Sequence, residues 1–260
     1  GLYSPECEHD ACGVVLVVNI NGIKYHDIIE KGLTVLENMA HRGAEGADSK
    51  TGDGAGIMVQ IPHEFILLNG IPVPEKGRYG VGMIFLPKDA GDNARFTEII
   101  NECVEANNLT VMHSRTVPVN SEILGQAALA AEPEIRQVFI TGCDDRKTLE
   151  DKLYLVRKAI ERKVLDSSIK DKPACYVASL STTTIVYKGM LSTMQLRQYF
   201  PDLTNPYFTS AIAMVHSRFS TNTFPTWSLA QPFRLIAHNG EINTIRGNRL
   251  WIKTRESVLK

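Results

Sequence analysis

Apolar residues follow the period of a β-strand along much of the chain and the period of a helix in a few stretches. The segment 12–19, CGVVLVVN, is β-rich and apolar enough to predict a strand buried on both faces. Similar strand-like runs occupy 56–62, 79–86, 109–117, 136–142, 174–180, 183–188, 211–219 and 234–240. Helical spacing predicts helices over 26–41, about 92–107, about 147–164 and from about Ile242 onward. Because the strands come in groups, without strict alternation with helices, the pattern predicts one α+β domain.

Two polar stretches interrupt this pattern and are predicted to be loops. The first, HRGAEGADSKTGDGAG at 41–56, is too rich in glycine to hold regular structure. Its Gly-Asp-Gly-Ala-Gly segment precedes a strand and lacks a Gly-Lys-Ser/Thr ending, so it matches neither a dinucleotide fingerprint nor a P-loop. The second, STNTFPTWSLAQPF at 220–233, carries Phe224, Pro225 and Trp227 and is more apolar than exposed loops tend to be. It is either a lid over a site or a packed corner.

Charge and cysteine content narrow the classes of function. A formal net charge of −1, with Lys and Arg scattered, argues against a nucleic-acid or membrane-surface partner. No apolar run approaches the roughly 18 residues that span a bilayer. Cysteines at 7, 12, 103, 143 and 175 are odd in number and widely spaced, which fits a reducing, cytoplasmic setting. Cys7, His9 and Cys12 have no fourth ligand at a zinc spacing, so no metal site is predicted.

Cys12 opens the first predicted strand and is followed by Gly13. The residues before it, 1–11, lack the basic and apolar regions of a signal peptide. If the bond between Ala11 and Cys12 were cut, one residue would carry both a thiol and an α-amine. Their ordinary pKa values, about 8.5 and about 7.7–8.0, suit proton transfer near neutral pH, so the amine could serve as the base that activates the thiol. Gly13 would let a substrate approach the backbone closely. The alternative is a buried strand cysteine without chemistry.

Donors for an oxyanion are present in the segment His238-Asn239-Gly240-Glu241, at the end of a strand-like run. Acyl transfer from an amide passes through a tetrahedral oxyanion that needs fixed hydrogen-bond donors. The Asn239 side-chain amide and the N–H of Gly240 would supply two. Asn-Gly is also a strong signal for a tight hairpin turn, and that alternative stays open.

A candidate substrate-binding segment is His216-Ser217-Arg218-Phe219-Ser220-Thr221-Asn222-Thr223. Arg218 leaves a predicted strand into a loop, where a guanidinium could bind a substrate carboxylate through a bidentate pair. The alternative is a solvated surface arginine.

Taken together and in this order, the motifs resemble the class II glutamine amidotransferases, and in particular the amidotransferase domain of glutamate synthases. The motifs are EHDACG at 8–13, HRGAEGAD and TGDGAGI between 41 and 57, HSRFSTNTFPTW at 216–227 and AHNGEINTIRGNR at 237–249. The resemblance extends from about residue 5 onward. It implies the four-layer αββα sandwich of N-terminal-nucleophile hydrolases, with residues 1–11 removed as a leader and 12–260 forming the domain.

The resemblance also implies roles for particular residues. Cys12 would be the nucleophile, and Asn239 with Gly240 would form the oxyanion hole. Arg218 would bind the α-carboxylate of L-glutamine. Gly240 and Thr221 would be further substrate-binding residues, and the supporting residues would be Arg42, which braces the new N-terminus, together with Gly13, His238 and Trp227.

The implied reaction is hydrolysis of L-glutamine through a γ-glutamyl thioester. The ammonia would pass to a central, FMN-binding synthase domain, in the same or a separate chain, which aminates 2-oxoglutarate. FMN and an iron–sulfur cluster are expected only in that synthase region, with no cofactor in this chain. The family's Ser-Asp-Ser-like motif, whose acidic residue holds the substrate α-amine, does not occur between Asn243 and Lys260, so we expect the domain to be truncated at its C-terminal end. Two alternatives stay open: an amidotransferase serving another ammonia acceptor, and a non-catalytic glutamine-binding or regulatory domain with the same fold.

Overall fold

Strands and helices are mixed along the chain in the computed structural model, which describes residues 12–42, 48, 50–219, 223–238 and 245–258. The strands are β1 (Gly13–Val18), β2 (Ala55–Gln60), β3 (Gly80–Leu86), β4 (Thr110–Thr116), β5 (Glu134–Thr141), β6 (Tyr176–Ser181), β7 (Thr184–Gly189) and β8 (Ile212–Ser217). The helices are α1 (His26–Asn38), α2 (His63–Leu68), α3 (Ala90–Glu105), α4 (Gln126–Ala130), α5 (Arg146–Asp166), α6 (Gln195–Tyr199) and α7 (Arg246–Val258). Short 3-10 turns are η2 (Ala40–Arg42), η3 (Ser121–Ile123), η4 (Lys172–Ala174) and η5 (Pro201–Thr204).

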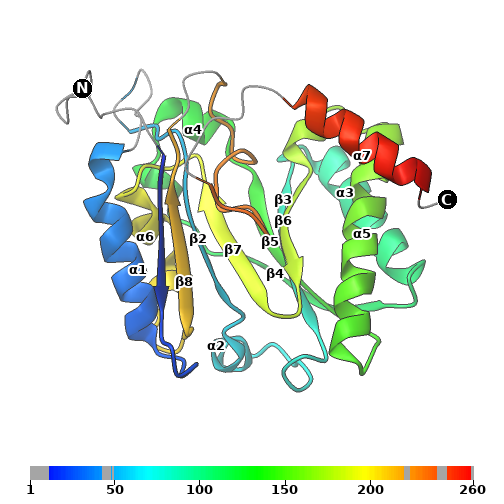
Figure 1. Cartoon of the computed structure of the whole chain (residues 1–260), viewed down its shortest axis with the longest axis horizontal. Helices are drawn as coiled ribbons and strands as arrows, with labels where there is room; N and C mark the ends of the chain where they lie inside the picture. Colours follow the sequence, from blue (N-terminus) through cyan, green and yellow to red (C-terminus); the bar gives the residue numbers. More distant parts are fainter. Residues whose placement is uncertain (1–11, 43–47, 49, 220–222, 239–244, 259–260) are drawn as a thin grey trace.

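The strands form two antiparallel sheets that stand beside each other (Figure 1). The first sheet has the order β1-β8-β2-β7, and the second has the order β4-β5-β3-β6. Helix α1 packs against β1 and β8, whereas α5 packs against β6 and β3, on the far side of the second sheet. The two sheets contact each other through β7 of the first sheet and β6 and β3 of the second. The α+β class predicted from the sequence is therefore confirmed, with helices on the two outer sides of a pair of sheets.

Strand β3 shows why the second sheet lies inside the molecule. Every residue from Gly80 to Leu86 is buried, and alternate side chains point to opposite faces. Met83 and Phe85 join the core cluster that also contains α1 and both sheets. Ile84 and Leu86 join a separate cluster with α3 and α5. Burial on both faces explains why this strand reads as a continuous apolar run.

Most elements lie where the sequence pattern predicts them, with ends displaced by a few residues. Two predictions are wrong. Strand β1 is not buried on both faces: it forms an edge of its sheet, and Leu16 and Val18 are 52% and 43% exposed. The run that begins at Arg234 is not a strand over its described part, 234–238. There the Phe233 N–H donates to the Ile236 carbonyl at 2.9 Å, and the apolar side chains of Leu235 and Ile236 are exposed, so the apolar run forms a surface turn.

Candidate active site

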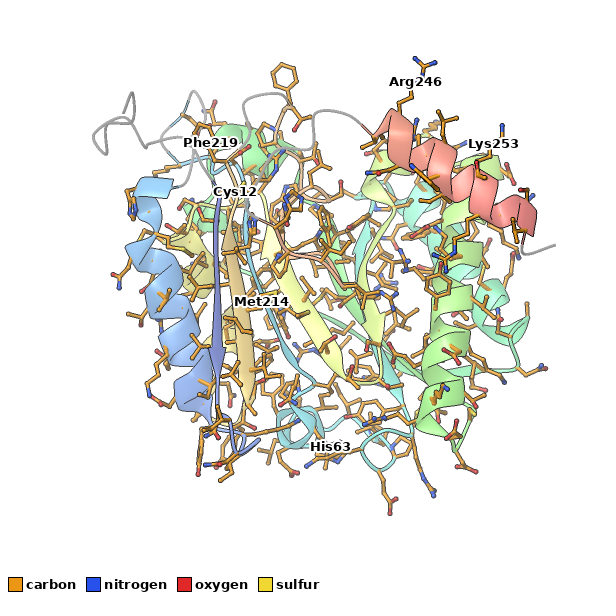
Figure 2. The ribbon with its side chains drawn as sticks, viewed as in Figure 1. Cys12, His63, Met214, Phe219, Arg246 and Lys253 are labelled. Atoms are coloured by element: carbon orange, nitrogen blue, oxygen red, sulfur yellow. The ribbon has the colours of Figure 1, made fainter. Side chains whose placement is uncertain are left out.

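Cys12 lies where β1 begins, at the end of the first sheet at which β8 ends. The antiparallel register pairs Gly13 with Ser217, which brings Cys12 beside the residues that follow β8. The Cys12 thiol donates to the Phe219 carbonyl at 3.2 Å, and the Phe219 N–H donates to Cys12 Sγ at 3.4 Å. Figure 2 shows the two residues together at the upper end of the sheet. Cys12 is a free, partly exposed thiol, so the interpretation of a fully buried strand cysteine does not hold.

Arg218 is the next residue after β8 and is only 7% exposed, so the alternative of a solvated surface arginine is wrong. Its Nη1 donates to the Asp53 carboxylate at 2.6 Å and to the Asp53 carbonyl at 3.2 Å. Its Nη2 donates to Thr223 Oγ1 at 2.6 Å, and its backbone N–H donates to the Gly54 carbonyl at 2.8 Å. These bonds fix the guanidinium of Arg218, the residue that directly precedes Phe219, which the Cys12 thiol contacts. A fixed, desolvated fork of this kind suits recognition of a carboxylate.

The loop before β2 reaches this site because of its glycines. Gly54 has a φ of +148°, a conformation that L side chains rarely adopt, and a Cβ there would lie 3.1 Å from Ala230 Cβ. A Cβ on Gly56 would lie only 2.5 Å from the Gln231 carbonyl oxygen. Both glycines therefore allow the backbone at the start of β2 and just before it to approach segment 228–238 closely. They serve packing at the site.

Trp227 belongs to the packed corner that the sequence offered as one of two interpretations. Its side chain is 4% exposed, and its indole N–H donates to the Ala128 carbonyl at 3.1 Å. Its ring packs against Phe85 and Tyr199. Phe224, in contrast, is 92% exposed. Trp227 thus anchors one end of the segment that continues toward His238.

His238 is held by two buried side chains that sequence reasoning did not single out for this role. His216, on β8, donates from Nε2 to the His238 carbonyl at 2.8 Å. Gln231 accepts the His238 N–H on Oε1 at 3.3 Å. His216 is fully buried, and burial lowers its pKa to about 4, so its imidazole is neutral at ordinary pH. The neutral ring must carry its proton on Nε2 to bond a carbonyl.

Replacing His216 with glutamine is expected to flatten the acid dependence of stability. The unfolded imidazole binds a proton below its ordinary pKa of 6.5, whereas the folded one stays neutral down to about pH 4. The free energy of unfolding of the unmodified chain should therefore fall as pH drops from 6.5 to about 4, by up to about 1.4 kcal/mol per pH unit from this group. Denaturant titrations between these pH values compare the two chains. Equal slopes would show that His216 is not buried in its neutral form.

Several predicted site residues lie outside the described part of the chain or only partly within it. Asn239, Gly240 and Thr221 lie outside it. The backbone of Arg42 ends the 3-10 turn η2, but its side chain is outside the described part. Gly13 begins β1 and pairs with Ser217. Asp53 was missed as a site residue, and its position between Gly52 and Gly54 was the available signal in the sequence.

Among the described residues, no group of three or more His, Cys, Asp or Glu side chains is arranged to hold a metal ion. No helix in the same part of the chain has the length and apolarity needed to cross a bilayer.

Comparison with known proteins identifies the family to which the chain belongs. The model of the family described as "Glutamine amidotransferases class-II" matches residues 12–260, and the match begins at Cys12. The chain is 46% identical to "Glutamate synthase [NADPH] large chain" of Bacillus subtilis, over 98% of this chain and 17% of that protein. It is 45% identical to "Glutamate synthase [NADH]" of Saccharomyces cerevisiae, over 100% of this chain and 12% of that protein. A third relative, "Ferredoxin-dependent glutamate synthase 2, chloroplastic" of Arabidopsis thaliana, is 42% identical over 97% of this chain and 16% of its own length.

The chain thus spans less than a fifth of the length of these curated relatives. Its agreement with them extends over nearly all of its own residues, including the strands and loops that bring Cys12 and Arg218 together. The chain therefore belongs to the class II glutamine amidotransferases, and within that family it matches the amidotransferase domain of glutamate synthases.

Proposed function

We propose that this chain hydrolyses L-glutamine with Cys12 as the nucleophile and supplies the ammonia to a synthase region that aminates 2-oxoglutarate. The observation that carries the proposal is that a free thiol, Cys12, and a buried arginine, Arg218, lie close together at one end of the first sheet. The Cys12 thiol bonds to the backbone of Phe219, and the preceding residue is the buried arginine Arg218. If glutamine binds Arg218 through its α-carboxylate, its side-chain amide can reach the neighbouring Cys12 thiol.

Cleavage of the bond between Ala11 and Cys12, with residues 1–11 as a leader, gives Cys12 a free α-amine. That amine takes the thiol proton as sulfur attacks the side-chain amide carbon, and returns a proton to the departing nitrogen as ammonia leaves. The γ-glutamyl thioester then reacts with water, which releases glutamate and restores the thiol. In this mechanism the amine replaces the histidine that many cysteine hydrolases use as a base.

Further residues complete the proposed site. The Asn239 amide and the Gly240 N–H stabilise the oxyanion, and Gly240 and Thr221 also contact the substrate. Arg42 braces the N-terminus that cleavage creates. The contact of His216 and Gln231 with His238 supports this assignment, because it fixes the residue that directly precedes Asn239. Gly13 keeps the approach to Cys12 open.

For the architecture, we infer the αββα sandwich of N-terminal-nucleophile hydrolases over residues 12–260. Support comes from the two antiparallel sheets and from the contacts of α1 with the first sheet and of α3 and α5 with the second (Figure 1). The position of Cys12 immediately before β1 also agrees with a nucleophile that opens a strand.

The partner of the reaction is proposed to be the synthase region of a glutamate synthase, since the relatives are several times longer than the chain. FMN and an iron–sulfur cluster belong to that region in this proposal. The cytoplasmic location stays a prediction, because one of the similar proteins is named chloroplastic.

The test is covalent labelling of the complete native protein with 6-diazo-5-oxo-norleucine, a glutamine analogue that alkylates the attacking thiol. Intact mass and peptide mapping are expected to show one adduct, on a chain that begins at Cys12. Excess L-glutamine should slow the labelling. Cys143 is a matched control, because it is also a free, partly exposed thiol but lies away from Arg218, in the turn before α5. Labelling of Cys143 at the same rate, or no labelling at all, would reject the proposed site.

A further inference from the structure

Lys188 is a lysine with a fully buried side chain at the interface of the two sheets and segment 228–238. It lies on β7 and has a relative exposure of 0%. Its ammonium donates to the Ala230 carbonyl at 2.7 Å, to the Ser228 carbonyl at 2.9 Å and to the Tyr176 hydroxyl at 3.3 Å. An ammonium has three N–H donors, and these oxygens accept all of them.

Two aromatic rings complete the environment of the ammonium. The Nζ atom lies 4.7 Å from the ring centroid of Tyr176 and 4.7 Å from that of Phe233. None of the ion pairs among the described residues involves Lys188. Burial lowers the pKa of the Lys188 ammonium to about 7. The carbonyls and the ring faces act in the opposite direction, because both interact more favourably with the charged form.

Burying a charge that pairs with no carboxylate among the described residues is costly, and an apolar side chain would fill the same space without that cost. Lys188 therefore has to be explained by what its ammonium holds. Both carbonyls belong to segment 228–238. The residue that follows Ala230 is Gln231, whose side chain accepts the His238 N–H. The opposite side of the segment is also in close contact, because the Gln231 carbonyl lies directly against Gly56.

The bond from Lys188 to the Ala230 carbonyl also supports Arg218, through Gly54. Ala230 packs on Gly54, where a Cβ would lie 3.1 Å from the Ala230 Cβ. The Gly54 carbonyl accepts the backbone N–H of Arg218 at 2.8 Å. Lys188 thus binds a backbone that touches both ends of the site: His238 through Gln231, and Arg218 through Gly54.

We propose that Lys188 is a positioning residue, whose ammonium fixes segment 228–238 so that His238 and Arg218 keep their places relative to Cys12. The proposal rests on the proposed glutamine hydrolysis. It predicts a defect in catalysis by folded protein, because the held segment leads directly into the residues proposed to bind the oxyanion. Misplacing one oxyanion donor costs about 100-fold or more in kcat.

The decisive variant is Lys188→Met in the complete native protein, which keeps an unbranched side chain only one atom shorter and removes its charge and its donors. The expected result is a decrease in kcat for glutamine hydrolysis of about 100-fold. KM should rise by less than about 3-fold, because Asp53 and Thr223 still hold the guanidinium of Arg218. Gln137→Met is the matched control, since Gln137 is a buried polar residue on β5 that bonds Tyr187 rather than segment 228–238. It should keep kcat near that of the unmodified protein at an equal folded fraction.

A second variant, Lys188→Gln, retains an N–H donor in an uncharged side chain and guards against misfolding of the methionine variant. Its kcat should lie between those of Lys188→Met and the unmodified protein. A kcat within about 3-fold of the unmodified protein for both folded variants would overturn the positioning role, and so would a change confined to KM. If the unmodified protein neither hydrolyses glutamine nor reacts with the diazo analogue, the proposed function itself fails, and that outcome is distinct from the first two.

Discussion

Replacing Cys12 with alanine is expected to remove glutamine hydrolysis, with kcat/KM falling by about 10⁴-fold or more. The loss is this large because the other described thiols have a raised pKa or, like Cys143, lie away from Arg218. Cys103 is buried in α3, and burial raises its thiol pKa. Burial raises the pKa of Cys175 to about 12, so it carries almost no thiolate at neutral pH. If leader removal is autocatalytic, the alanine variant should also retain residues 1–11. Ammonia release from glutamine and intact mass together measure both effects.

Cys143→Ala is the control for this experiment, because it removes a partly exposed thiol whose contact is with Asp145, before α5. Hydrolysis by this variant should equal that of the unmodified protein. Activity that survives in Cys12→Ala would exclude Cys12 as the nucleophile, and activity lost in both variants would point to general damage by thiol removal.

Replacing Arg218 with alanine is expected to raise KM for glutamine by about 100-fold, because the carboxylate loses a charge-assisted, bidentate partner worth about 3 kcal/mol. It should also lower the free energy of unfolding by about 3–5 kcal/mol, since the Asp53 carboxylate, 6% exposed, loses its ion pair with the guanidinium. The rate constant kcat should change less than KM, because the α-carboxylate is distant from the reacting amide. Steady-state kinetics and denaturant titration measure the two effects separately.

A double variant separates recognition from stability at this position. Asp53→Asn removes the negative charge that faces Arg218, so Arg218→Ala combined with Asp53→Asn should recover part of the lost stability while KM stays high. A KM that is unchanged in Arg218→Ala would remove this arginine from the substrate site. A KM restored by the second substitution would mean that stability, and not recognition, caused the increase.

The sequence predicts the order of elements well wherever alternation or helical spacing is long. Strand β1 was placed correctly, but its burial was overestimated, because an apolar run does not show whether other elements cover both faces of the strand. The prediction of a strand after Phe233 was wrong for a related reason. Its apolar residues suggested a strand, whereas the chain closes a turn on itself and exposes Leu235 and Ile236.

At the site, the local sequence singled out the candidate reactive groups but not the residues that hold them. Arg218 could be read as exposed because its partner, Asp53, is 165 residues earlier in the chain. Lys188 ends a strand pattern in which a lysine normally faces water, and only the tertiary structure brings two carbonyls of a later segment onto its ammonium. Such pairings depend on sheet register and loop path, which single-residue patterns do not encode.

The contact between Cys12 and Phe219 joins residues 207 positions apart, and this separation has a consequence during protein synthesis. The thiol leaves the ribosome early, whereas β8 and the arginine that follows it emerge only after most of the domain. At ordinary elongation rates the interval is roughly 10–40 s. Throughout that time the nascent chain carries the proposed nucleophile without the proposed substrate site. In the proposed mechanism, reactivity toward glutamine therefore begins only after β8 and Arg218 have been synthesised, so the order of synthesis itself delays ammonia release until the structure around the site can fold.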